Sequence, residues 1–136
     1  MKKDISKMIK AYKIPYESIK CAEQRVGFEF PKELVSFYSE VGYGFVNNKQ
    51  GAINRLIDPE TCADIRLREG VYEFDPDLEL YSSFEDDKMI FFEVNEGVYI
   101  SIGIHDNQIY YLNHIIANGL LEFIEKISEN PDYWCE

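Results

Sequence analysis

The chain has 136 residues, of which 46% are hydrophobic, 15% aromatic and 29% charged, and its formal net charge at pH 7 is −11. This length predicts one domain over residues 1–136, with enough chain to bury a core without disulfides. The composition excludes a disordered chain, and no apolar run approaches the ~20 residues of a membrane-spanning helix. The first residues lack the apolar core of a secretory signal, so we expect a cytoplasmic protein with no membrane partner.

Charge is divided unequally along the chain. Residues 1–68 carry 12 basic and 9 acidic side chains, a net charge of +3, whereas residues 69–136 carry 2 basic and 16 acidic ones, a net charge of −14. An acidic surface repels phosphates and attracts basic proteins, so direct binding of nucleic acid is not expected. The sequence instead favours a basic protein partner.

The first third of the chain shows three helical patterns. Ile5, Met8, Ile9 and Tyr12 follow the spacing of one helical face and predict a helix that ends before Pro15. Apolar residues at the same spacing predict helices over 16–26, ended by Gly27, and over 31–41, with Pro31 in the first turn and Gly42 after the last.

Short strands and turns follow these helices. "GFV" and "GAINRLI" flank "NNKQ" and predict a hairpin, and Asp58-Pro59 predicts the start of a short helix. Strands are predicted at 89–94, 98–104 and 108–113, with Val98, Ile100 and Ile102 on one face of the second. A closing helix is predicted from Asn118, burying Leu120, Leu121, Ile124 and Ile127. The predicted fold class is α+β: N-terminal helices, an antiparallel sheet of five to six strands, and a C-terminal helix.

No pattern of catalytic residues or metal ligands stands out. His105 and His114 match no metal-ligand spacing, and "GYG" at 42–44 lacks the Lys and Ser/Thr of a phosphate-binding loop. Cys21, Cys62 and Cys135 have no CxxC spacing and are expected as reduced thiols that pack as small hydrophobic groups. We therefore expect no enzyme, no metal and no cofactor, although a hydrolase using the many carboxylates is an alternative that the sequence leaves open.

The acidic segment, residues 69–87, is the most unusual stretch. It holds eight Asp or Glu residues and no Lys or Arg, interleaved with aromatic and aliphatic side chains. Acidic groups can steer a basic partner, and aromatic groups such as Tyr72, Phe74 or Tyr81 can anchor it. Equally, these aromatics could point inward while the acids only keep the protein soluble. The predicted partner-binding residues are Tyr72, Glu73, Asp75, Asp77, Glu79, Tyr81, Glu85, Asp86 and Asp87.

Several ordered motifs over residues 17–128 resemble the SUKH superfamily, the Smi/Knr-type domain. They are Ile19, Glu23, Gly27 and Pro31 in "SIKCAEQRVGFEFP"; Phe37, Val41, Gly42 and Gly44; Phe84 ahead of the central strand; and the closing "ANGLLEFI" helix. Tyr43 departs from the pattern, since family members often carry a second consecutive Gly there.

The resemblance implies an immunity protein that binds and neutralises a cognate toxin domain, here a basic nuclease whose active site an acidic surface would block. It also implies that the recurrent Gly and Pro positions are structural. Other family members are interaction scaffolds, so a cytoplasmic regulatory scaffold without a toxin is the alternative. A weak homodimer is a further assembly that the sequence allows.

Overall fold

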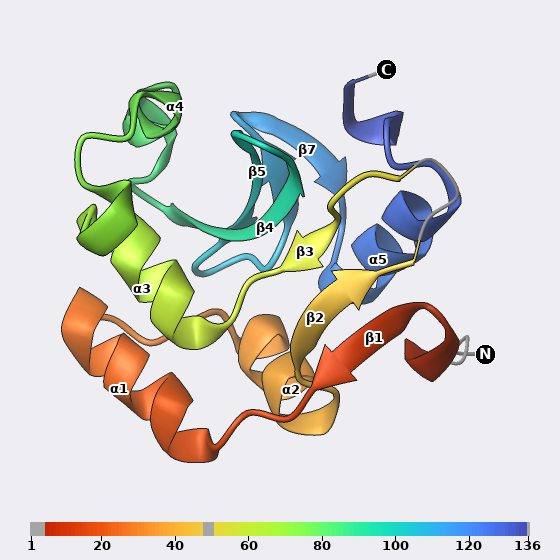
Figure 1. Cartoon of the computed structure of the whole chain (residues 1–136), viewed down its shortest axis with the longest axis horizontal. Helices are drawn as coiled ribbons and strands as arrows, with labels where there is room; N and C mark the ends of the chain where they lie inside the picture. The colour runs from red at the N-terminus through yellow and green to blue at the C-terminus, as the bar shows by residue number, and fades with distance from the viewer. Residues whose placement is uncertain (1–4, 48–50, 136) are drawn as a thin grey trace.

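Seven strands within residues 5–47 and 51–135, the part of the chain that the computed structural model describes, form one antiparallel sheet (Figure 1). Each strand pairs with the next one along the chain, so the sheet is a meander. In chain order the strands are β1 (Ile9–Tyr12), β2 (Tyr43–Val46), β3 (Arg55–Leu56), β4 (Lys88–Asn95), β5 (Val98–Gly103), β6 (Ile109–Tyr111) and β7 (His114–Ala117).

The helix predicted for residues 5–12 is wrong. This stretch forms a short 3-10 helix, η1 (Ile5–Lys7), and then the edge strand β1. Four residues of β1 pair with β2, and Ile9 is buried at 3% exposure. The apolar spacing fits a helix locally, but a short isolated helix is marginal, and pairing with β2 satisfies the same backbone groups while burying Ile9.

Close approach of β1 to β2 depends on two glycines. Gly42 and Gly44 both have positive φ, and a Cβ on Gly44 would lie 2.0 Å from the Lys10 carbonyl oxygen. No side chain fits at that distance, so glycine is required where the two backbones meet. The structural role implied for these positions is confirmed.

The predicted β2–β3 hairpin is confirmed, although its turn residues 48–50 lie outside the described residues. The three later strands are also confirmed, and β5 is buried on both faces, including Tyr99 and Ser101. The predicted strand count is too low because β1 and β7 were not anticipated. Strand β7 continues the meander from β6 through a tight turn and forms the second edge of the sheet.

Helices α1 (Tyr16–Val26) and α2 (Lys32–Glu40) lie close to their predicted limits. Helix α3 (Pro59–Leu67) begins as predicted, because the Asp58 carboxylate accepts hydrogen bonds from the Thr61 amide and hydroxyl. Helix α1 packs along α3, and α3 packs against β4. Figure 1 shows these two helices side by side at one end of the sheet.

Helix α5 (Leu120–Glu129) closes the core on one face of the sheet, with Phe123 edge-on to the ring of Phe92. It starts at Leu120, two residues later than predicted. The Glu33 carboxylate of α2 accepts a hydrogen bond from the Leu120 amide and so caps the first turn of the helix. Leu121 is 37% exposed, so its predicted burial is wrong, whereas Ile124 and Ile127 are buried as predicted. Among the described residues, no helix combines the length and apolar character needed to cross a membrane.

Candidate functional site

The acidic segment folds into a corner of the molecule, marked by α4 in Figure 1. It contains the 3-10 helix η2 (Gly70–Tyr72), the one-turn helix α4 (Pro76–Glu79) and the 3-10 helix η3 (Ser82–Phe84). The carboxylate of Asp75 caps α4 by accepting a hydrogen bond from the Asp77 amide at 2.9 Å. The segment therefore has a defined backbone conformation despite its charge.

Two apolar side chains fix the segment to the core. Leu78 is fully buried and Tyr81 is 2% exposed. The Tyr81 hydroxyl accepts a hydrogen bond from the Tyr99 amide at 2.9 Å, and the two rings meet edge to face at 5.6 Å. Strand β6 pairs with β5 only at Ser101 and Ile102. The Tyr81 hydroxyl therefore takes the place of a neighbouring strand as the acceptor for the Tyr99 amide.

Two arginines of α3 and its C-terminus hold the base of the segment. Arg66 donates to the backbone carbonyls of Glu85 and Lys88, both at 2.6 Å. Arg68 binds the Glu85 carboxylate and also donates to the Leu78 carbonyl. Because Glu85 is 8% exposed, this ion pair is shielded from solvent and joins the two ends of the segment.

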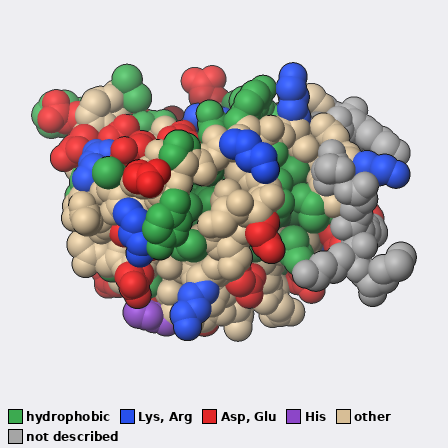
Figure 2. Space-filling model, turned by 90° about the horizontal axis from the view of Figure 1, so that it is seen from below, with side chains coloured by type: hydrophobic (Ala, Val, Ile, Leu, Met, Phe, Trp, Pro, Cys, Tyr) green, Lys and Arg blue, Asp and Glu red, His purple; other side chains and the backbone are tan. Residues whose placement is uncertain are grey.

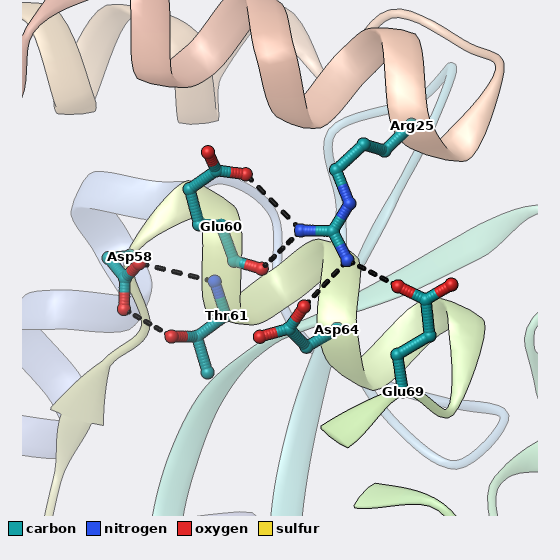
Figure 3. Close-up of polar contacts among 6 residues, drawn as sticks. All are labelled: Arg25, Asp58, Glu60, Thr61, Asp64 and Glu69. Atoms are coloured by element: carbon teal, nitrogen blue, oxygen red, sulfur yellow. Dashed lines mark hydrogen bonds and ion pairs between the residues drawn. The ribbon is translucent and has the colours of Figure 1, made fainter. Parts of the chain in front are cut away.

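A third arginine ties α1 to the start of the segment. Figure 3 shows the Arg25 guanidinium among three carboxylates, with Nη2 2.6 Å from Asp64 and 2.7 Å from Glu69, and Nη1 3.3 Å from Glu60. Hydrogen bonds to Asp64 and Glu69 raise the pKa of Arg25 well above its usual range. Exposed pairs contribute little individually, but this network constrains where the segment leaves α3.

The outward tip of the segment is apolar. Phe74 is 90% exposed, Val71 86% and Leu80 55%. Phe74 also has φ of +63°, a left-handed conformation that costs an ordinary residue about 1–2 kcal/mol. An exposed phenyl ring on strained backbone has no folding rationale, and both features are typical of binding sites. We call Val71, Phe74 and Leu80 the apolar tip.

Carboxylates surround the apolar tip. Glu73, Asp77, Glu79, Asp86 and Asp87 are exposed, and Asp75 is half-buried. Figure 2 shows one face of the molecule, on which acidic side chains gather at one end with Lys or Arg side chains among them, and further acidic and basic side chains are scattered over the rest. The negative charge is therefore concentrated, although it is not confined to one surface.

The structure separates the nine predicted partner-binding residues into three groups. Tyr81 and Glu85 are wrong as surface contacts, because one fills the core and the other is paired with Arg68. Tyr72 is half-buried against the core, and the other six remain available at the surface. Val71 and Leu80 were missed: nothing in a run without periodicity indicates which apolar side chains point outward.

The site offers surface rather than reactive groups. Among the described residues, no cluster of three or more His, Cys, Asp or Glu side chains could hold a metal ion. A hollow of about 510 Å³ that several carboxylates line lies between α2 and α5, and there Glu33 already caps α5. Of the three thiols, only Cys62 packs in the core as expected, while Cys21 and Cys135 are exposed.

The meander, the glycine-dependent β1–β2 contact and the acidic segment held by three arginines define a small α+β protein, and comparison with known families identifies its family. The chain belongs to the SUKH family: the family model SUKH_6, described as SMI1-KNR4 cell-wall, matches residues 16–124. This confirms the resemblance expected over residues 17–128.

A curated relative extends the comparison. The chain is 43% identical over 128 residues to a protein of Bacillus subtilis (strain 168) named immunity protein YxxD, an alignment that covers 92% of this chain and 87% of the relative. No solved structure gives a significant match to the chain.

Proposed function

We propose that this protein is an immunity protein that binds and neutralises a cognate protein toxin in the cytoplasm. The observation that carries the proposal is the 43% identity to immunity protein YxxD over 92% of the chain. An immunity protein acts by binding, which agrees with a surface built from exposed apolar and acidic groups rather than from reactive ones.

The acidic segment is the proposed contact surface. Its backbone is pre-formed by Arg25, Arg66 and Arg68, so binding orders little additional chain. The apolar tip supplies desolvated contact area, and Phe74 is the side chain best placed to enter a pocket of the partner. Around it, the proposed contacts are Tyr72, Glu73, Asp75, Asp77, Glu79, Asp86 and Asp87.

The charge favours a basic toxin such as a nuclease, whose active-site groove grips phosphates. An acidic surface is attracted to such a groove, and steering of this kind allows association rates up to ~10⁸–10⁹ M⁻¹s⁻¹ at low salt. Once docked, the acidic segment occupies the position of the phosphates, and the toxin cannot bind its substrate. The immunity protein itself performs no chemistry in this mechanism.

Co-expression with the toxin domain encoded by the adjacent gene tests the function. We expect growth to be rescued and a stable complex to be recovered by size-exclusion chromatography. Absence of both rescue and complex would favour the alternative, a regulatory scaffold without a toxin.

Charge reversal tests the surface. The variant E73K/D77K/E79K/D86K should associate more slowly and with weaker salt dependence than the wild-type chain. The variant E17K/E29K/E40K/D132K makes the same change in net charge at exposed positions outside the segment, so it separates a local contact from the total charge. Equal association rates for the two variants would place the interface elsewhere.

A further inference from the structure

A row of cross-strand partners runs across the outward face of the sheet, opposite the face that α5 covers. The register pairs Lys10 with Phe45, Phe45 with Arg55, Arg55 with Glu93, and Glu93 with Tyr99. Directly paired residues of an antiparallel sheet share a face, so all five side chains lie on one side of β1 to β5. At ~4.8 Å per strand, the row spans roughly 19 Å.

One end of the row reaches the acidic segment. Tyr81 packs on Tyr99 there. Burial lowers the pKa of Arg55, but the side-chain hydrogen bond with Tyr72 and the charge of Glu93 outweigh it, and the net shift is upward. Tyr72 is thus near enough to act on the charge of Arg55, and Tyr81 covers the buried Tyr99, so the acidic segment adjoins this end of the row.

The other end of the row is open. Phe45 is 46% exposed and Tyr12 43%, and the ring of Tyr12 lies 5.6 Å from that of its cross-strand partner Tyr43. Lys10 and Lys13 beside them are exposed. This end is aromatic and basic, whereas the acidic segment is apolar and acidic.

The apolar tip alone is too small for a stable complex. Specific interfaces bury roughly 800 Å² on each partner. A buried aromatic side chain contributes about 150–250 Å², and the two aliphatic side chains of the tip contribute less. A tight complex therefore needs additional surface next to the tip, and the open end of the row supplies it.

We propose that the outward face of β1 and β2 is the second half of the toxin-binding surface, with Tyr12 and Phe45 as contacts and Lys10 facing an acidic group of the toxin. This inference rests on the proposed function. It adds a requirement on the partner. The toxin must be basic where it meets the acidic segment, and about 20 Å from that basic region it must carry an apolar patch next to an acidic group.

Two other surfaces are less suited to this role. The hollow between α2 and α5 is formed by those helices and is not next to the apolar tip. Its charged lining is mostly acidic, with Glu33, Glu40 and Glu122, so it is less suited to an acidic part of the toxin. Edge strand β7 exposes Ile115, but the Ile116 carbonyl already accepts a hydrogen bond from Tyr133 at 2.8 Å, which obstructs pairing with another strand.

The test measures binding of an inactivated form of the toxin domain encoded by the adjacent gene, by titration calorimetry and stopped-flow kinetics. Phe45→Ala and Tyr12→Ala should each weaken binding at least 10-fold. Leu121→Ala is the matched control, because Leu121 is 37% exposed on α5 and lies away from this face. Thermal unfolding of each variant checks that the fold is retained.

Lys10→Glu separates local contact from steering. This variant makes the chain more negative. If Lys10 makes no direct contact and only overall attraction to a basic toxin matters, the association rate should stay the same or increase. A contact between Lys10 and an acidic group instead predicts faster dissociation and weaker binding. Lys32→Glu, at an exposed position on α2, is the control of equal charge.

Three results are distinguishable. Weaker binding of the β1–β2 variants, with the controls unchanged, supports the inference. Wild-type affinity for all of them overturns it and leaves the immunity function intact. Failure of the wild-type chain to bind the toxin domain overturns the proposed function and this inference with it.

Discussion

Arg68 and Glu85 form an ion pair that closes the base of the acidic segment, with Nη2 2.5 Å from Oε1. Both side chains are largely shielded, at 29% and 10% exposure. Because they lie at opposite ends of the segment, the pair determines where residues 69–85 leave and rejoin the body of the protein.

Arg68→Met should lower the free energy of unfolding by about 3 kcal/mol, because it leaves the Glu85 carboxylate buried without a partner. The double variant R68M/E85M removes both charges and should recover most of that loss. Urea denaturation of the two variants and the wild-type chain measures the effect. Equal destabilisation of the single and double variants would show that the charge of Glu85 is not the cause.

Phe74→Asn should weaken toxin binding while leaving the fold unharmed. Asn accepts the left-handed conformation more readily than Phe, and the phenyl ring that is removed is 90% exposed. We expect the free energy of unfolding to rise by up to about 1 kcal/mol and affinity for the toxin to fall at least ~30-fold, the loss typical of a hot spot. Thermal unfolding and calorimetry measure the two effects on the same sample. A fall in stability would indicate that Phe74 supports the fold.

Local signals in the sequence were sufficient for some elements. Asp58-Pro59 and Gly27 mark helix ends correctly, because capping depends on a few neighbouring residues. Residues 9–12 mislead because their apolar spacing suits a helix, and only the adjacent β2 makes the strand preferable.

The acidic segment shows the same limit for the site. Its acids and aromatics mark it as unusual, but the inward direction of Tyr81 depends on Tyr99, which is distant in sequence, and the outward direction of Phe74 depends on a left-handed turn. Glu85 looked like another surface carboxylate because its arginine partner belongs to a different element.

Gly44→Ala should destabilise the fold far more than Gly27→Ala. Both glycines have positive φ, which costs alanine about 1–2 kcal/mol. A Cβ on Gly27 meets nothing within 4 Å, whereas one on Gly44 lies 2.0 Å from the Lys10 carbonyl oxygen and forces β1 away from β2. We expect a loss of at least about 3 kcal/mol for Gly44→Ala by urea denaturation. Equal losses would mean that β1 shifts without cost.

Two of the three thiols should react with Ellman's reagent in the native protein. Cys21 and Cys135 are exposed, whereas Cys62 is buried at 1% exposure. Burial also raises the pKa of the Cys62 thiol to about 12, so little thiolate forms at pH 8. The third thiol should react only in denaturant. Single Cys→Ser variants at Cys21 and Cys135 identify the fast groups, and rapid reaction of all three in native protein would contradict the buried position of Cys62.

Stability should fall at alkaline pH. Burial raises the pKa values of Tyr38, Tyr99 and Cys62, so their neutral forms are favoured in the folded state. In the unfolded chain these groups titrate near ~8.5 for Cys and ~10 for Tyr, so above these values the unfolded state binds fewer protons. The free energy of unfolding therefore decreases with rising pH, by up to ~1.4 kcal/mol per pH unit for each such group, and is fully retained below about pH 8.

Urea denaturation of the reduced protein between pH 7.5 and pH 10.5 measures this slope. Tyr38→Phe removes one titrating group, so its curve should fall less steeply with pH than that of the wild-type chain, even if its stability at pH 7.5 is lower. Tyr38 is the informative position because its hydroxyl is buried and donates to the Ile57 carbonyl. A wild-type free energy of unfolding that stays constant up to pH 10.5 would show that these groups ionise in the folded protein as readily as in the unfolded chain.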